Sequence, residues 1–286
     1  MDIKIENLSY TYSPDTPFSV SALKNISCEI KSGEFVGLIG HSGSGKSTLI
    51  QHLNGLIKIQ SGKITVGNRV LSEKNADTKG LCFDVGLVFQ YPEQQLFAET
   101  VFEDIAFGPK NMGLDDFEIK MRVETAAEFA GLKKELLTKT PVSLSGGQKR
   151  RAAIAGGIAM EPSILILDEP AAGLDPKGKT KMLDSIRRIH KEMNMTVILV
   201  SHSMEDAAEY CGKLMVMNRG ELFAFGTKEE IFSRADELMK IGLNVPQVTE
   251  AANKLKAHGI DLGEHIYTID DVKASLLQYM KGKKNA

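Results

Sequence analysis

Two hydrophobic patterns divide the 286-residue chain into segments of different kinds. Near the amino terminus apolar and polar positions alternate, so that Ile26, Cys28 and Ile30 fall on one face of an extended chain. A strand with a single apolar face belongs to a sheet that is buried on one side only. We therefore predict a small, half-exposed antiparallel sheet from residues 2–32 and 62–71.

Three later segments are nearly continuous apolar runs: residues 34–40, 163–168 and 196–202, with the sequences EFVGLIG, SILILD and TVILVSH. A strand buried on both faces has this composition, because neither of its sides contacts water. Such strands occur in parallel sheets covered by helices, and helix-like segments separate these three. The pattern predicts an α/β fold.

Two regions of the chain lack an apolar strand pattern and are predicted to be helical. Residues 92–151 are one of them, a helical subdomain inserted ahead of the second apolar strand. The other is residues 226–286, in which Thr227 and Thr268 each stand three residues before an acid, the spacing of a capping box. The chain should divide into a main domain, residues 1–225, and a helical carboxy-terminal appendix.

The end of the appendix has the spacing of an amphipathic helix. Val272, Leu276 and Met280 recur at four-residue intervals and give the helix one apolar face. Residues 281–286 are rich in lysine, and we predict a solvated chain end there in preference to a membrane anchor.

Composition narrows the classes of protein that the chain can represent. The formal net charge is -2 and the isoelectric point about 6.3, so no overall basic field favours nucleic acid. No apolar run is long enough to span a membrane, and the amino terminus lacks the apolar core of a signal peptide. The cysteines, Cys28, Cys82 and Cys211, form no closely spaced pair, which favours reduced thiols in a cytosolic protein.

A glycine-rich segment, GHSGSGKST, follows the first apolar strand and matches a P-loop in its strand–loop–helix context. Glycines let backbone N–H groups turn towards phosphate oxygens, and the helix start adds positive potential. Lys46 should reach the β- and γ-phosphates, and Ser47 should bind Mg²⁺. His41 occupies a free position of the motif, so an incidental loop residue is the alternative there. The predicted phosphate-binding residues are Gly40, His41, Ser42, Gly43, Ser44, Gly45, Lys46, Ser47 and Thr48.

Polar residues end the other buried strands, at the edge where open α/β sheets bind ligands. Asp168 is suited to hold Mg²⁺, and Glu169 is suited to polarise the attacking water or accept its proton. His202 would contact the γ-phosphate, and Gln90, which ends a further strand-like run, can reach the metal or the water. The predicted catalytic residues are Glu169, His202, Gln90 and Lys46. The predicted Mg²⁺ ligands are Ser47, Gln90 and Asp168.

A second phosphate-binding element, LSGGQ at residues 144–148, lies far along the chain from the P-loop. With GHSGSGKST, Gln90, LILDEP, GLD and His202, in this order, it resembles the nucleotide-binding subunits of ABC ATPases over residues 2–225. The resemblance implies that two such domains face each other head to tail. The LSGGQ loop of each then closes over the ATP on the partner's P-loop, so hydrolysis requires dimerisation.

The resemblance assigns this signature loop to the partner's nucleotide. Ser145 and the N–H groups of Gly146 and Gly147, with Gln148 completing the loop, would stabilise charge on the partner's γ-phosphoryl group. The basic residues 149–151 that follow are expected to form a solvated helix face or local ion pairs.

Two further nucleotide contacts follow from the resemblance. Asp175 corresponds to the loop that runs along the dimer interface. Tyr12 matches the aromatic residue that stacks on adenine, with Tyr10 as a competitor and an ordinary strand-face tyrosine as the alternative. ATP and Mg²⁺ are the cofactors implied.

Variable segments resemble one branch of this family more closely. Residues 40–56 and 90–114 are similar to the ATPases of energy-coupling-factor (ECF) transporters, which import vitamins and transition-metal ions. Residues 153–178 and the inserted residues 15–27 are most similar to the second ATPase of those heterodimers. The resemblance implies a peripheral protein at the cytoplasmic face of the cell membrane, with residues 226–286 in dimer contacts. Its implied partners are a second ABC ATPase, a transmembrane coupling subunit and a membrane substrate-binding subunit, with no nucleic acid.

The segment 91–104 is the expected docking site for a short cytosolic helix of the coupling subunit. Its apolar residues would anchor that helix, and its carboxylates could pair with arginines of the helix. A surface helix with solvated acids is the alternative. The apolar residues are Leu96, Phe97, Val101 and Phe102. The acidic residues are Glu93, Glu99, Glu103 and Asp104.

Two other functions are considered. A soluble ABC ATPase that acts on nucleic acid or ribosomes usually has paired ABC domains in one chain, zinc-site cysteines or coiled-coil insertions, and none is visible here. A regulatory ATP sensor without turnover would have a damaged catalytic set, whereas Gln90, Glu169 and His202 are all present. The sequence leaves the transported substrate open, and also the choice between a heterodimer and a homodimer.

Overall fold

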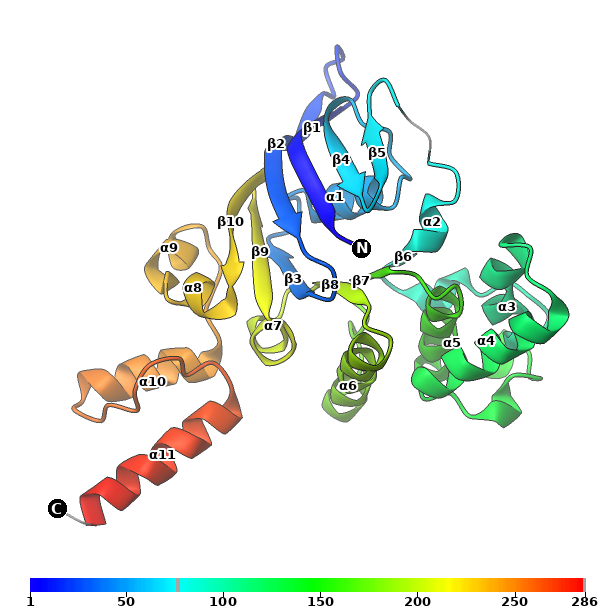
Figure 1. Cartoon of the computed structure of the whole chain (residues 1–286). Helices are drawn as coiled ribbons and strands as arrows, with labels where there is room; N and C mark the ends of the chain where they lie inside the picture. Colours follow the sequence, from blue (N-terminus) through cyan, green and yellow to red (C-terminus); the bar gives the residue numbers. More distant parts are fainter. Residues whose placement is uncertain (76–77, 285–286) are drawn as a thin grey trace.

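The computed structural model describes residues 1–75 and 78–284, with side chains as far as residue 280, and these residues form two sheets with helices around them (Figure 1). The smaller sheet has the strand order β2-β1-β4-β5, and its neighbouring strands are antiparallel. The larger sheet has the order β10-β9-β3-β8-β7-β6. Its strands are parallel from β9 to β6, and β10 is antiparallel to β9. The predicted antiparallel and parallel sheets, and with them the α/β fold, are confirmed.

The strands of the smaller sheet are β1 (Ile3–Tyr12), β2 (Val20–Ile30), β4 (Ser61–Val66) and β5 (Arg69–Ser72). The strands of the larger sheet are β3 (Phe35–Gly40), β6 (Val85–Val88), β7 (Ile164–Asp168), β8 (Thr196–Val200), β9 (Lys213–Asn218) and β10 (Glu221–Thr227). The helices of the main domain are α1 (Lys46–Leu53), α2 (Leu81–Asp84), α3 (Val101–Asn111), α4 (Asp116–Phe129), α5 (Gly146–Ala159), α6 (Pro176–Glu192) and α7 (Met204–Tyr210). Short 3₁₀ turns are η1 (Pro92–Gln95), η2 (Lys134–Leu136) and η3 (Pro141–Ser143). The carboxy-terminal helices are α8 (Lys228–Phe232), α9 (Ala235–Lys240), α10 (Gln247–Ala257) and α11 (Ile269–Lys284).

The larger sheet is buried on both faces, which explains its continuous apolar runs. On β3, Phe35 and Ile39 pack into the cluster that contains the helices α5 and α6. Val36 and Leu38 point the other way, into the cluster shared with α1 and the smaller sheet. Successive side chains of a strand point to opposite faces, so a strand between two cores needs apolar residues at every position.

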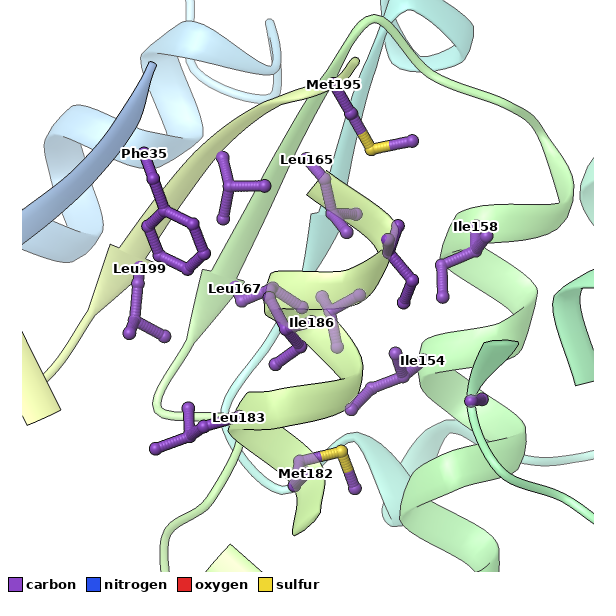
Figure 2. Close-up of a cluster of buried hydrophobic side chains, with 14 of the residues drawn as sticks. Phe35, Ile154, Ile158, Leu165, Leu167, Met182, Leu183, Ile186, Met195 and Leu199 are labelled. Atoms are coloured by element: carbon purple, nitrogen blue, oxygen red, sulfur yellow. The ribbon is translucent and has the colours of Figure 1, made fainter. Parts of the chain in front are cut away.

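The helices α5 and α6 close one face of the larger sheet. Figure 2 shows Ile154 and Ile158 of α5 and Ile186 of α6 gathered against Leu165 and Leu167 of β7. None of these side chains is more than 1% exposed. Burying each of them stabilises the fold by roughly 1.5–3 kcal/mol. The helix that follows LSGGQ is therefore anchored to the strand that ends in the acidic pair.

The helical subdomain contains the helices α3 to α5, and no strand is described between residues 92 and 151. The predicted end of this region, residue 151, falls inside α5, which continues to Ala159. Ile154 and Ile158, one helical turn apart, keep the helical spacing past that point. Likewise the predicted start of the appendix, residue 226, falls in β10.

The appendix contains both predicted capping boxes, but its last helix packs differently from the expected pattern. Thr227 caps α8 through Glu230, and the N–H and side-chain hydroxyl of Thr268 both bond Asp271 at the start of α11. The apolar face was expected to contain Leu276 and Met280, but they are 36% and 59% exposed.

Of the predicted face only Val272 is described in the cluster formed with the α10 region, and Tyr279 joins it there. This face is set by the position of α10 beside α11, which four-residue spacing along one helix does not specify (Figure 1). The side chains of residues 281–286 lie outside the described residues, so their solvation stays a prediction. The cysteines are free thiols, of which Cys82 is exposed.

Candidate active site

The P-loop connects β3 to α1 and depends on glycine at two positions of close approach. Gly40 and Gly45 have φ angles of 150° and 102°. A Cβ at Gly40 would lie 2.3 Å from the carbonyl oxygen of Met217, and one at Gly45 would lie 2.5 Å from that of Ala22. Glycine removes both overlaps, and the loop can wrap its N–H groups around an anion. Ser44 is only 3% exposed, so it can contribute to such a site mainly through its backbone.

Lys46 lies beneath this loop with part of its hydrogen-bonding capacity free. Its ammonium donates to the carbonyl oxygens of Gly40 and His41 at 2.7 and 2.8 Å. Burial lowers the pKa of Lys46, and the charges of Glu169 and Asp168 oppose that shift. An ammonium group has three donors, so one remains for a phosphate oxygen.

A cleft of ≈ 380 Å³ brings together most of the predicted site. It contains residues of the P-loop, the ends of the buried strands and the amino-terminal sheet. Val20, Ser21 and Ala22, at the start of β2, also line it, and no motif in the sequence indicated them. The predicted residues that line the cleft are Tyr12, Ser42, Gly43, Gly45, Lys46, Ser47, Thr48, Gln90, Asp168, Glu169 and His202.

Two predicted catalytic side chains, those of Gln90 and His202, converge on the carboxylate of a third, Glu169. Glu169 follows β7, and its N–H donates to the carbonyl oxygen of Val200 at 3.1 Å. Its Oε1 is bonded to Nε2 of His202, and its Oε2 accepts a hydrogen bond from Nε2 of Gln90 at 3.4 Å. The parallel order of β6, β7 and β8 brings these residues together, because their carboxyl ends meet at one edge. A carboxylate held at both oxygens is oriented to bind a water molecule and take its proton.

The oxygen atoms at this edge fit a magnesium ion. Asp168 lies beside Glu169, and burial, followed by the Glu169 charge, raises the pKa of its carboxyl. Ser47 and Gln90 share the cleft and add a hydroxyl and an amide oxygen. Mg²⁺ takes few protein ligands and completes its shell with water and substrate phosphates. In the described part of the chain no group of three or more His, Cys, Asp and Glu side chains is placed to hold a metal ion.

The position of Tyr12 separates the two candidate adenine-stacking residues. Tyr12 is 39% exposed at the cleft, and its hydroxyl lies 3.2 Å from Oγ1 of Thr48. Tyr10 packs edge-on between Tyr12 and His52, with ring centroids 4.8 Å apart in both pairs. Tyr10 therefore supports the exposed ring, and the geometry favours Tyr12 as the base contact.

The signature loop is not part of the cleft of its own chain. Ser145 caps α5: its Oγ accepts from the N–H of Gln148, and the Gln148 side chain accepts from the N–H of Ser145 at 2.9 Å. None of the described residues 144–148 lines the cleft. Figure 1 shows α5 beside α3 and α4, away from α1. Asp175, the exposed residue before α6, is also outside the cleft.

Two predictions about single residues change. The side chain of His41 turns to the appendix, where its Nε2 donates to the carbonyl oxygen of Ile241 at 2.6 Å, and it does not line the cleft. Arg150 was expected on a solvated face or in a local ion pair, but it is 4% exposed and bonded to Glu93, far away in the sequence. Because Arg150 bonds to both oxygens of Glu93, this carboxylate is not free to pair with an arginine of a partner helix, contrary to the prediction from the sequence.

The fold and this cleft define a P-loop ATPase of the ABC class. The family model described as ABC transporter matches residues 23–172. The chain is 53% identical to the energy-coupling factor transporter ATP-binding protein EcfA2 of Caldanaerobacter subterraneus subsp. tengcongensis, with 100% of both chains covered. Identity to the protein of the same name from Clostridium perfringens is also 53%, covering 98% of this chain and 99% of that one. The chain belongs to this family and is an ATP-binding subunit of an ECF-type transporter.

Solved structures agree with that assignment. The cbiO1 protein of Clostridium perfringens, titled part of the ABC transporter complex cbiONQ, has a TM-score of 0.74 and 38% identity, covering 88% of this chain and 98% of that one. An ATP-binding cassette solved as a dimer in a post-hydrolysis state with ADP and Pi has a TM-score of 0.70 and 29% identity, covering 79% of this chain and 98% of that chain. None of the described helices has the length and apolar character of a membrane span.

Proposed function

We propose that this chain binds and hydrolyses MgATP at the cytoplasmic face of the membrane and thereby powers an importer of vitamins or transition-metal ions. The observation that carries the proposal is the cluster of Gln90, Glu169 and His202 beside the P-loop lysine in one cleft. A regulatory ATP sensor without turnover would not need a carboxylate held in this way.

Each group in the cleft has a place in phosphoryl transfer. The P-loop N–H groups and the free donor of Lys46 bind the phosphates. Mg²⁺, when held by Ser47, Asp168 and Gln90, neutralises phosphate charge. Glu169 accepts a proton from the attacking water as the water oxygen bonds to the γ-phosphorus and the bond to ADP breaks. His202, bonded to the same carboxylate, orients Glu169 and lines the cleft in which the γ-phosphate would bind.

The outlying position of Ser145 supports a site completed by a second ATPase, either a related chain or a second copy. The N-terminus of α5 carries free N–H groups and a serine hydroxyl but has no phosphate loop of its own chain in reach. The dimeric cassette among the solved structures has the same fold. We place Ser145 and the adjacent glycines over the nucleotide of the partner, and Asp175 and the appendix at the dimer interface.

A groove beside the Gln90 loop is suited to a coupling helix of a transmembrane subunit. Its volume is ≈ 360 Å³, and Phe97 and Phe107, 71% and 51% exposed, stack edge-to-face at its rim. Asp104 also lines the groove, and its Oδ2 is buried with no hydrogen-bond partner among the described residues. Its Oδ1 accepts the N–H groups of Phe97 and Ala98 at 3.0 and 3.1 Å, so this carboxylate fixes the wall of the groove that an apolar partner helix would contact. Val101, predicted as an anchor, is 0% exposed and belongs to the core.

The catalytic part of the proposal is tested with Glu169→Gln in the assembled complex. The substitution keeps the shape of the side chain and removes its basicity, so ATP should remain bound in a closed dimer with little turnover. Phosphate release and nucleotide retention are measured on the same sample. Hydrolysis at the rate of the unmodified complex would refute the role of Glu169.

The transport part is tested by affinity purification of the tagged chain from detergent-solubilised native cells, followed by mass spectrometry. A second ABC ATPase with polytopic membrane proteins is the expected result, and the substrate-binding subunits among them would indicate the cargo. Membrane proteins without a second ATPase would indicate a symmetric pair. Ribosomes or nucleic-acid proteins without any membrane protein would refute the importer.

A further inference from the structure

A single buried arginine connects three segments that the proposed reaction uses. Arg150 lies near the start of α5, shortly after Ser145, and is 4% exposed. Lys149 and Arg151, its neighbours on the same helix, are only partly buried. Burying an unpaired charge is strongly unfavourable, so a guanidinium that is almost completely buried must have specific hydrogen-bonding partners.

The first partner is the carboxylate of Glu93. Nε and Nη2 of Arg150 donate to its two oxygens at 3.0 and 2.8 Å, in the parallel two-bond geometry that only arginine provides. Burial acts to raise the pKa of Glu93, but the hydrogen bond from Arg150, a backbone hydrogen bond and the charge of Arg150 together lower it. Glu93 belongs to η1, three residues after Gln90.

The second partner is a backbone carbonyl on the other side of the catalytic cluster. Nη1 of Arg150 donates to the carbonyl oxygen of Ala172. The N–H of Ala172 in turn donates to the carbonyl oxygen of Glu169 at 3.1 Å, so the guanidinium is one hydrogen-bonded step from the catalytic residue. Ala172 stands three residues after Glu169, as Glu93 does after Gln90.

We propose that Arg150 is a positioning residue for ATP hydrolysis, which holds the Gln90 loop and the segment after Glu169 at one fixed spacing from the signature helix. Arg150 is not among the residues that line the cleft. Its effect is on the geometry of the Gln90–Glu169 pair and on the position of Ser145, which begins the same helix. The inference rests on the proposed roles of these residues in hydrolysis.

The test compares Arg150→Lys with Arg151→Lys in the purified, assembled complex. Lysine keeps the charge but cannot make two parallel bonds to Glu93 and a third to Ala172. Arg151 is the matched control, because it is an arginine on the same helix that, among the described residues, makes just a long hydrogen bond of 3.4 Å to the carbonyl oxygen of Gly131. We expect Arg150→Lys to lower kcat roughly tenfold or more while KM for ATP changes less than about twofold, and Arg151→Lys to leave both unchanged.

Glu93→Gln provides a second, independent perturbation, which also serves if Arg150→Lys fails to fold. It should reproduce the fall in kcat, and the double variant should be no slower than Arg150→Lys alone, because both changes break the same contact. Unchanged kcat in Arg150→Lys, or additive losses in the double variant, would overturn the inference. Glu169→Gln is measured in parallel: if that variant turns over normally, the proposed catalytic function fails first.

Discussion

Gly45→Ala isolates the steric requirement of the P-loop, because Gly43 offers a natural comparison in the same loop. Both residues have positive φ, 102° at Gly45 and 75° at Gly43. A Cβ at Gly43 would meet no atom within 4 Å, whereas one at Gly45 would lie 2.5 Å from the carbonyl oxygen of Ala22. The difference between the two alanine variants therefore measures mainly the overlap with β2, where Cδ2 of Leu23 would also lie 3.1 Å from the new Cβ.

The expected loss of stability has two contributions, backbone strain and steric overlap. A left-handed backbone costs an alanine about 1–2 kcal/mol, and this is the whole cost expected at Gly43. At Gly45 the overlap adds about 1–3 kcal/mol, because Ala22 is held in a strand that cannot simply move aside. For a chain of this size each kcal/mol lowers Tm by about 2–4 °C.

Differential scanning calorimetry without nucleotide should therefore place Gly43→Ala about 2–8 °C below the unmodified chain, and Gly45→Ala about 4–20 °C below it. Whenever the two variants are compared, Gly45→Ala should have the lower Tm. Equal melting temperatures for the two variants would refute the reasoning, since the overlap with Ala22 would then have no cost. A Gly45 variant as stable as the unmodified chain would refute it more strongly.

Two further predictions concern binding. Tyr12→Ala should weaken ATP binding roughly 5- to 150-fold, the range for loss of one base–aromatic stack, while Tyr12→Phe should retain the affinity. Inorganic tripolyphosphate has no base, so its affinity should be the same for both variants. An equal loss of tripolyphosphate binding in Tyr12→Ala would contradict stacking. Asp104→Lys should abolish recovery of membrane proteins with the tagged chain without changing its ATP affinity, because it removes the acceptor of the Phe97 and Ala98 N–H groups and places a cation in the groove wall. Glu128→Lys, at an exposed acid of α4 outside both the groove lining and residues 91–104, is the control, and equal recovery from the two variants would exclude the proposed contact.

The parts of the molecule that could be predicted are those whose information is local. The P-loop is a continuous segment whose glycine spacing already specifies a strand, a turn and a helix, and its context appeared as expected. The acidic pair and His202 could be brought together because the carboxyl ends of parallel strands share an edge. In each case a short stretch of sequence, together with one general rule of sheet geometry, was sufficient.

The predictions that failed depend on partners distant in the sequence. Arg150 stands in a basic run that is typical of an exposed helix face, and only the approach of Glu93 and Ala172 from other segments buries it. Val101 was predicted as an apolar anchor of the docking segment, yet the position of α3 places its side chain in the core. His41 turns towards the appendix because Ile241 happens to pass beside the loop. The pattern of residues along one helix or loop does not show which distant segments will pack against it.

The capping box at the start of α5 limits which amino acids can replace Ser145 in natural or engineered variants. Its Oγ accepts the N–H of Gln148, which uses a lone pair and leaves the hydroxyl proton free to donate. Aspartate and asparagine begin helices as well as serine does. Aspartate, however, would bring a negative charge and no donor to the proposed phosphate of the partner. A screen that selects only for a stable fold would thus accept replacements that a screen for turnover rejects.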